Sequence, residues 1–210
     1  MQKSILKFSF YITGAVLLAL GVQFAILSRL GAGAYDALNY NLSVFLTKYL
    51  KTNISLGTAM FMTMVLLFTI AMILKPRLEY LLGFLLAAFI GLMIDLFSKI
   101  IPPVNSFPIQ VLYYILGILA IAFGVALIIR SKMPMTPMDN LMMIVVQKTK
   151  KPVALIKTLL EALYALIAII LGYLSGIAFG AVSLGTIVMT LLMGPTINLF
   201  LKVVKPIKKA

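Results

Sequence analysis

Residues 108–130 read PIQVLYYILGILAIAFGVALIIR, a run in which the only charged side chain is the final Arg130. A helix of about 20 residues is enough to cross the hydrocarbon core of a bilayer. The rest of the chain has the same character, since 63% of its 210 residues are hydrophobic and 11% are charged. Soluble domains are about half apolar and about a quarter charged. We therefore expect an integral membrane protein that contacts the lipid bilayer.

Five further apolar segments are long enough to span a membrane. The six predicted transmembrane helices cover residues 8–30, 54–74, 78–101, 108–130, 153–174 and 177–201. Two shorter segments, 34–50 and 137–147, each have an Asp and an Asn near their start. Their length favours short re-entrant or amphipathic helices, because irregular backbone at membrane depth is tolerated only where it is buried in protein or lines a cavity. The predicted fold is therefore all-α.

The chain also aligns with itself at an offset of 103 residues. The aligned pairs include Tyr11 and Tyr114, Gly14 and Gly117, Gly21 and Gly124, and Asp36 and Asp139. A constant offset of this kind indicates a tandem duplication. We expect one membrane domain built from a first repeat at 1–103 and a second at 104–210. The paired glycines, seven residues apart in each repeat, predict close packing between helices.

The basic residues predict that the two repeats are inverted relative to each other. Lys and Arg concentrate in cytoplasmic loops. The segment before the first span is basic, and its counterpart at 104–107 is not. The short-helix region, in contrast, is more basic in the second repeat than in the first. The repeat with more basic residues continues to alternate from loop to loop up to the end of the chain. Three crossings per repeat explain the alternation. We therefore expect an inverted 3+3 repeat with both termini cytoplasmic. In the alternative, the two short helices also cross the membrane, and the two repeats are then parallel.

Composition excludes several kinds of functional site. The chain has no His and no Cys, which rules out zinc and iron–sulfur centres, disulfides and Ser-His-Asp triads. The net charge of +13 is explained by the topology of a membrane protein and does not require a nucleic-acid partner. We predict that the chain is not an enzyme and that it uses no metal or other cofactor.

Two matching motifs introduce the short helices. The first repeat has Gly31-Ala-Gly-Ala-Tyr-Asp36, whose glycines are small and conformationally free where the span must break. The second repeat has Pro134-Met-Thr-Pro137-Met-Asp139, in which Pro137 suits the first position of a helix. Each motif places a carboxylate in the first turn of a short helix.

Two interpretations of these carboxylates remain open. In the first, Asp36 and Asp139 cap the short helices and neutralise Arg29 and Lys132. In the second, the short helices converge on a cavity between the repeats, because ionisable residues inside a membrane usually line pathways or pair with one another. In such a cavity a carboxylate is able to take up a proton or bind a cation.

The same residues carry a resemblance to a known family. Residues 31–39 (GAGAYDALN) are similar to the glycine-rich, aromatic-Asp motif of the YczE/YyaS/YitT family of bacterial membrane proteins, with Tyr35 in place of Trp. Residues 184–200 (LGTIVMTLLMGPTINLF) resemble its other motif, a span that starts at Gly-Thr and ends in Gly-Pro and a polar residue. The resemblance covers nearly the whole chain. It implies a multi-pass protein of the bacterial cytoplasmic (inner) membrane and implies little about the substrate.

The hypothesis favoured by the sequence is a small secondary transporter of a charged or zwitterionic solute. Interrupted helices in inverted repeats point to a site near mid-membrane, and proton coupling through Asp36 or Asp139 fits that arrangement. The predicted substrate-binding residues are Ser28, Arg29, Asp36, Asn39, Ser131, Lys132, Thr136, Asp139 and Asn140. The secondary candidates are Asp95, Asn198 and Glu161.

An alternative from another functional class is a scaffold or accessory subunit that transports nothing. Its basic cytoplasmic face would bind a partner protein or anionic lipid, each charge near the surface being worth about 1 kcal/mol. A transporter is expected to have a polar cavity between its halves, whereas a scaffold is expected to have a dry, packed interface. The sequence leaves the oligomeric state open.

Overall fold

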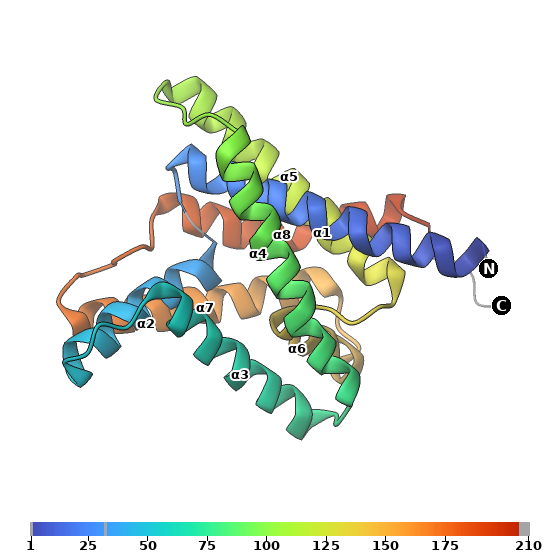
Figure 1. Ribbon diagram of the computed structural model, residues 1–210, viewed down its shortest axis with the longest axis horizontal. Coiled ribbons are helices and arrows are strands. Elements are labelled where there is room, and N and C mark those ends of the chain that lie inside the picture. Colours follow the sequence, from blue (N-terminus) through green and yellow to red (C-terminus); the bar gives the residue numbers. More distant parts are fainter. Residues whose placement is uncertain (1, 32, 206–210) are drawn as a thin grey trace.

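The computed structural model describes residues 2–31 and 33–205, and the regular elements in these ranges are all helical. They are α1 (Gln2–Ser28), α2 (Ala34–Leu50), α3 (Leu56–Leu74), the 3-10 helix η1 (Leu78–Leu81), α4 (Leu82–Ile100), α5 (Phe107–Ser131), α6 (Pro137–Thr149), α7 (Val153–Ser175) and α8 (Leu184–Val203), drawn in Figure 1. Within the described ranges, six helices are long and apolar enough to cross a membrane when η1 is joined to α4. The prediction of an all-α protein with six apolar spans and two short helices is confirmed.

The main difference from the predicted boundaries lies before α8, which begins at Leu184, seven residues later than expected. Gly176 and Gly180 adopt φ angles of 83° and 57°, which end α7 and turn the chain. The buried Asn41 of α2 holds this turn, because its side-chain amide donates to the carbonyl oxygen of Phe179 at 3.1 Å. Hydropathy alone does not detect such a turn, so the predicted span was too long at this end.

Helices α1 and α5 pack closely against each other at the centre of the fold (Figure 1). A Cβ built on Gly14 would lie 2.8 Å from the carbonyl oxygen of Gly124, and one built on Gly21 would lie 2.8 Å from that of Gly117. The contacts run in opposite directions along the two helices, so α1 and α5 are antiparallel. The prediction that these glycines serve close packing is confirmed.

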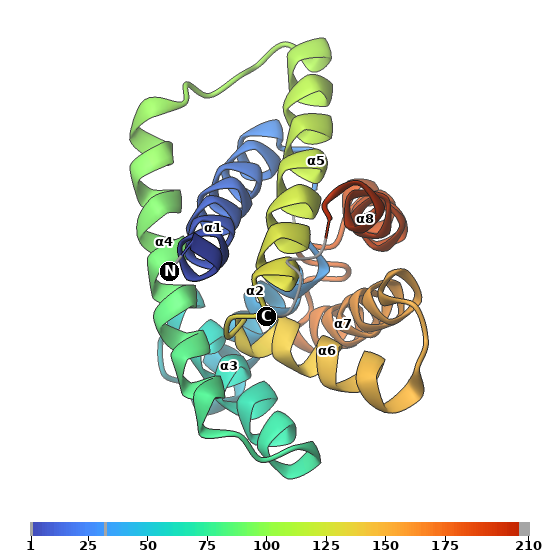
Figure 2. The ribbon, with the colours of Figure 1, turned by 90° about the vertical axis from the view of Figure 1, so that its right-hand side faces the viewer.

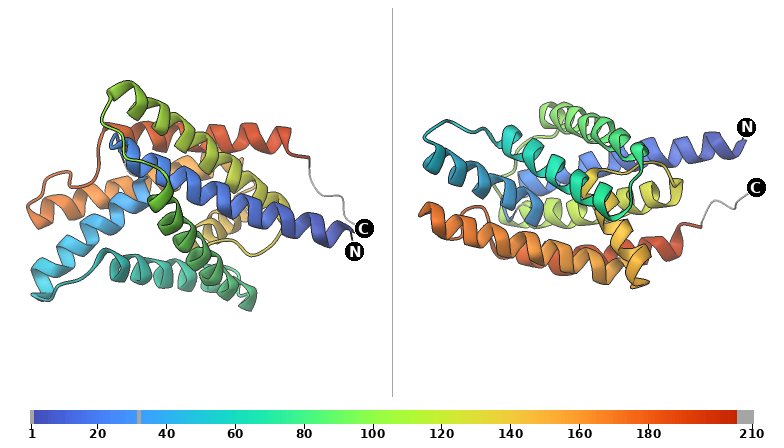
Figure 3. Two further views of the ribbon diagram at one scale, coloured as in Figure 1. Left: turned by 45° about the horizontal axis from the view of Figure 1, so that its top comes forward. Right: turned by 90° about the horizontal axis from the view of Figure 1, so that it is seen from below.

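The remaining helices complete two layers. Helix α4 packs on α1 and α8 packs on α5, so that α4, α1, α5 and α8 follow one another in a row, and the lower end of α4 continues beside α3 in Figure 2. In the second layer α2 packs along α7, and α3 packs along α6. The start of α1 and the end of α8 lie at the same end of the molecule (Figure 3).

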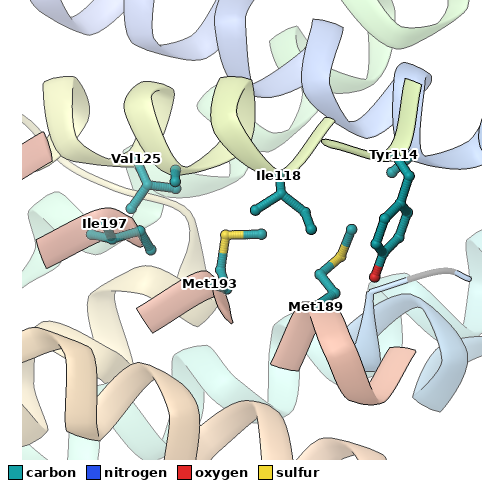
Figure 4. Packing of buried hydrophobic residues seen from close by; sticks show 8 residues of the cluster. Tyr114, Ile118, Val125, Met189, Met193 and Ile197 are labelled. Carbon is teal, nitrogen blue, oxygen red and sulfur yellow. The ribbon is translucent and has the colours of Figure 1, made fainter. Parts of the chain in front are cut away.

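The contact between α5 and α8 is made by large apolar side chains. Figure 4 shows Tyr114, Ile118 and Val125 of α5 facing Met189, Met193 and Ile197 of α8. The hydroxyl group of Tyr114 also donates a hydrogen bond to the backbone oxygen of Gly185. This contact fixes α8 beside α5 and places two methionines on the wall of the cavity described next.

Candidate functional site

A cavity of about 220 Å³ is lined by side chains from each of the eight α-helices of the described chain. Its apolar lining includes Leu18, Val22, Ala25, Ile26, Met60, Met64, Ala87, Ile90, Ile94, Ile121, Val125, Met138, Met189 and Met193. Its polar lining comes from α2, from α6 and its N-cap, and from α7, and consists of Tyr35, Asp36, Thr136, Asp139, Lys157 and Glu161. The charged lining therefore belongs to one layer of the fold, while the other layer contributes apolar walls.

Lys157 is the only cation among the described lining residues. Its Nζ lies 2.9 Å from Oε1 of Glu161 and 3.8 Å from Oδ1 of Asp139. The side chains of Lys157, Asp139 and Glu161 are 5%, 3% and 10% exposed. Glu161 follows Lys157 by one helical turn, and the pair is buried at the cavity. One ammonium group is thus shared by two carboxylates.

The Asp139 carboxylate has one satisfied and one unsatisfied oxygen. Its Oδ2 accepts a hydrogen bond from Thr136 Oγ1 at 2.9 Å, whereas the buried Oδ1 has no hydrogen-bond partner in the described part of the chain. Thr136 also accepts from the backbone N–H of Asp139 at 3.3 Å and so caps α6. Burying a carboxylate oxygen without a hydrogen-bond donor costs free energy of folding. Asp139 lines a cavity in which a ligand has room to bind.

Asp36 lies in the first turn of α2, next to a helix start that has no side-chain cap, because the N-cap residue is Gly33. The structure gives the Asp36 carboxylate no ion pair within residues 2–31 and 33–205. Neither Asp36 nor Asp139 therefore caps its helix by a hydrogen bond, and neither pairs with Arg29 or Lys132. The predicted pairing with Arg29 and Lys132 is therefore wrong for the described residues. Both carboxylates lie in the first turn of a short helix, so their interaction with the helix dipole stays a prediction.

The break between α1 and α2 is made differently from what the glycines suggested. The residue with a left-handed backbone is Arg29, with φ of 56°, while Gly33 has φ of −58°. Gly31 is needed for its small size, since a Cβ there would lie 2.5 Å from Ser183 Oγ at the start of α8. In the second half Pro137 begins α6, as predicted.

The structure brings four of the sequence-predicted residues together at the cavity: Asp36, Thr136, Asp139 and the secondary candidate Glu161. The two predicted cations lie elsewhere. Arg29 donates to the side chain of Asn105 at 3.4 Å on the exposed surface. Lys132 lines a separate cavity of about 300 Å³. The involvement of these cations in binding stays a prediction.

Four of the remaining predicted residues donate side-chain hydrogen bonds to backbone carbonyl groups. Ser28 and Ser131 each donate to the carbonyl oxygen three residues earlier, both at 2.6 Å. The Asn39 amide donates to Tyr35 O at 2.7 Å, and the Asn140 amide donates to Met135 O at 2.7 Å. Asp95 is exposed and Asn198 is half-buried, and neither lines the 220 Å³ cavity. Their roles in binding also stay predictions.

Sequence reasoning missed Lys157 as a site residue. Lys157 precedes Glu161 by four residues, and such a pair on a helix is common and does not by itself indicate a site. The available signal was its position within an apolar segment, because charged side chains inside a membrane usually mark a functional site. The methionines and Tyr35 gave no comparable signal, since such residues are common in packed cores.

Comparison with known proteins places the chain in a family. Residues 5–202 match the family described as "Family of unknown function (DUF6198)". The chain belongs to this family. It is 28% identical over 203 residues to the uncharacterized protein YyaS of Bacillus subtilis, covering 95% of this chain and 94% of YyaS. It is 29% identical over 195 residues to the uncharacterized membrane protein YczE of the same organism, covering 92% of this chain and 84% of YczE.

A third relative is an uncharacterized protein of Haemophilus influenzae, 27% identical over 202 residues, with 96% of this chain and 84% of the relative covered. No solved structure matches the chain. The resemblance to YyaS and YczE inferred from the two motifs is confirmed. The six apolar helices together with these bacterial relatives identify a multi-pass membrane protein.

Proposed function

We propose that this chain is a small secondary transporter that binds a charged or zwitterionic solute in the 220 Å³ cavity. The observation that carries the proposal is the composition of the cavity wall, in which four buried or half-buried acidic or basic side chains line a cavity bordered by all eight α-helices. Ionisable groups at membrane depth are costly and mark substrate or ion pathways. Transporters place such groups at the interface between their repeats.

The proposed architecture is an inverted repeat of residues 1–103 and 104–210, and local geometry supports it. After α1, the N–H of Leu30 donates to Ser28 Oγ at 3.2 Å; after α5, the N–H of Met133 donates to Ser131 Oγ at 3.1 Å. The intervening residues, Arg29 and Lys132, have φ angles of 56° and 58°. These positions are related by the offset of 103 residues, so the two breaks share one conformation.

Helix packing supports the inverted orientation. The offset of 103 residues relates Gly14 to Gly117 and Gly21 to Gly124. The contact of Gly14 with Gly124 therefore corresponds to a contact of Gly117 with Gly21, and the structure has both contacts. This exchange is expected of antiparallel helices related by a twofold axis perpendicular to their length. Such an axis lies in the membrane plane, as in transporters with inverted repeats. The pairing of α1 with α4 and of α5 with α8 follows the same exchange.

In the proposed topology α2 and α6 do not cross the membrane, and both chain termini are cytoplasmic. The six remaining helices then give an even number of crossings, which agrees with the start of α1 and the end of α8 lying at one end of the molecule (Figure 3). Under this arrangement Asp36 and Asp139 enter the cavity on helices from opposite halves. Either carboxylate is suited to couple solute binding to proton uptake.

The proposal is tested with protein reconstituted into liposomes that contain a pH-sensitive dye. A panel of cationic, anionic and zwitterionic solutes is added outside, and solute uptake and internal pH are recorded. We expect at least one solute to be taken up by the wild type. The control is Gly91→Phe on α4, because Gly91 lines the cavity and nothing lies within 4 Å of a Cβ built there. The added ring is expected to occupy space in the cavity, so uptake should be lost; equal uptake by this variant would contradict the proposed site.

A further inference from the structure

The charged lining of the cavity is unbalanced. Among the described lining residues Asp36, Asp139 and Glu161 are acidic, and Lys157 is basic. Three negative charges against one positive charge give a net charge of −2 when all four groups are ionised. Charges out of water are strongly disfavoured unless they are paired. The cavity must therefore hold protons or take up a cation.

The two carboxylates of the short helices, Asp36 and Asp139, are less well satisfied than that of Glu161. Lys157 is closest to Glu161, at 2.9 Å, and lies 3.8 Å from Asp139. Oδ1 of Asp139 is buried and has no hydrogen-bond donor in the described part of the chain. Asp36 has no ion pair within the same residues. A ligand that brings positive charge into the cavity would satisfy groups that the protein leaves unsatisfied.

The surroundings of these carboxylates do not suit a metal ion. Across residues 2–31 and 33–205, no three His, Cys, Asp or Glu side chains come together in a way that would hold a metal ion. The remaining walls are apolar and include five methionines, namely Met60, Met64, Met138, Met189 and Met193. Hard cations prefer shells of oxygen ligands, whereas polarizable thioethers and an aromatic ring such as that of Tyr35 favour alkylammonium groups.

We infer that the solute is a small organic cation, an amine or quaternary ammonium compound with an apolar body. Its charge lies against Asp36 and Asp139, and its body lies among the methionines and the apolar side chains of α1, α4 and α5. This inference rests on the proposed transport function and names its substrate class. Buried apolar surface supplies affinity, while the two carboxylates select for positive charge.

Binding of such a cation exchanges it for a proton. In the empty cavity Asp36, which has no ion pair in the described part of the chain, keeps its proton; when the cation binds, the O–H bond of Asp36 breaks, the carboxylate pairs with the cation and the proton leaves to solvent. The ionisable groups that face these carboxyls are Lys157 and Glu161 of α7, with Tyr35 of α2 beside them. The phenol of Tyr164 packs on Tyr35, with 5.7 Å between ring centroids. The other helices contribute no ionisable side chain to the described lining.

The test measures binding of four aromatic probes that differ in charge. Purified full-length protein in detergent is titrated by calorimetry with benzyltrimethylammonium, benzyl alcohol, benzoate and phenylalanine. We expect benzyltrimethylammonium to bind at a ratio of one to one, and the other three to bind at least about tenfold more weakly, a difference well within the range of a single charge interaction. Buffers of different ionisation enthalpy will reveal proton release, and affinity for the cation will fall as the pH is lowered.

Matched variants locate the binding. Asp36→Asn and Asp139→Asn keep the shape of each side chain and remove its charge, and each should weaken cation binding at least about tenfold. Glu79→Gln is the control, because Glu79 is an exposed carboxylate that does not line the 220 Å³ cavity, and it should bind as the wild type does. Thermal unfolding of each variant separates loss of binding from loss of fold.

The outcomes distinguish the inference from the proposed function. Binding of benzoate or phenylalanine that is lost in Gly91→Phe would overturn the cation class and leave the solute site in place. Cation binding that survives Gly91→Phe would overturn both. Failure of the wild type to bind benzyltrimethylammonium, or unchanged affinity in both Asp→Asn variants, would overturn the inference as well.

Discussion

Gly14 of α1 lies directly against Gly124 of α5, so that a Cβ on Gly14 would be 2.8 Å from the Gly124 carbonyl oxygen. The reciprocal contact joins Gly21 and Gly117. Glycines allow two helix backbones to approach closely, which is a common way of packing helices in membranes. This pair of contacts holds the two proposed repeats together.

We predict that Gly14→Leu destabilises the protein. The leucine must push α5 away or adopt a strained rotamer, at a cost of about 1–3 kcal/mol. Thermal unfolding in detergent, followed by circular dichroism, measures the loss. Gly91→Ala is the control and should unfold close to the wild-type temperature, because its Cβ meets nothing within 4 Å. Equal effects of the two substitutions would contradict the assigned role of the glycine contact.

The inverted topology predicts which loops face each side of the membrane. The chain contains no Cys, so a single introduced thiol reports its position without background. We expect an impermeant thiol reagent applied to intact cells to label Thr52→Cys and not Pro76→Cys. Short helices that cross the membrane would reverse this pattern. Phe179→Cys and Lys150→Cys are controls, since both topologies place the first outside and the second inside.

Substitutions at the start of α6 distinguish a helix-capping role of Asp139 from a binding role. Thr136 is the residue that caps this helix, and its hydroxyl also donates to Asp139. Thr136→Ala should therefore cost about 0.5–2 kcal/mol of stability. Asp139→Asn should cost less, because its amide oxygen still accepts the Thr136 hydroxyl. Chemical denaturation of the two variants compares them; a larger loss for Asp139→Asn would mean that this carboxylate has a structural role.

The buried ion pair of Lys157 and Glu161 should behave as a coupled unit. Lys157→Met leaves Glu161 and Asp139 without their shared cation, and removing one partner of a buried pair costs about 3–5 kcal/mol. Lys157→Met combined with Glu161→Gln should recover part of that loss, because one uncompensated charge is removed. Unfolding of both single variants and the double variant gives the coupling energy. A purely additive result would show that the two side chains do not interact.

The membrane character and the helix boundaries could be predicted from the sequence because they depend on local composition. Six apolar runs, the short segment at 34–50 and the proline before Asp139 each carry their own signal. The start of α8 carried no such local signal, because the turn that precedes it is held by Asn41 of α2, which is distant in sequence. Hydropathy contains no information about that contact.

The site was predicted only in part for a related reason. Asp36 and Asp139 stood out because carboxylates are rare in this chain, and the motifs placed both at helix starts. Which cation joins them depends on how α7 packs against α6. Arg29 and Lys132 are near the aspartates in sequence, but the breaks after α1 and α5 place both side chains outside the 220 Å³ cavity. Lys157 is 18 residues from Asp139 in sequence and is brought to it by tertiary packing.

The most direct measurement is whether a thiol inside the cavity reacts with a water-soluble reagent. Gly91→Cys places that thiol on the cavity wall, and Leu85→Cys places one on the outer surface of the same helix, where Leu85 is 67% exposed. In membranes, a methanethiosulfonate carrying a trimethylammonium group should modify Gly91→Cys but not Leu85→Cys, and benzyltrimethylammonium should slow the reaction. If Gly91→Cys is as unreactive as Leu85→Cys, the interface is dry, and the chain is a scaffold without a solute site.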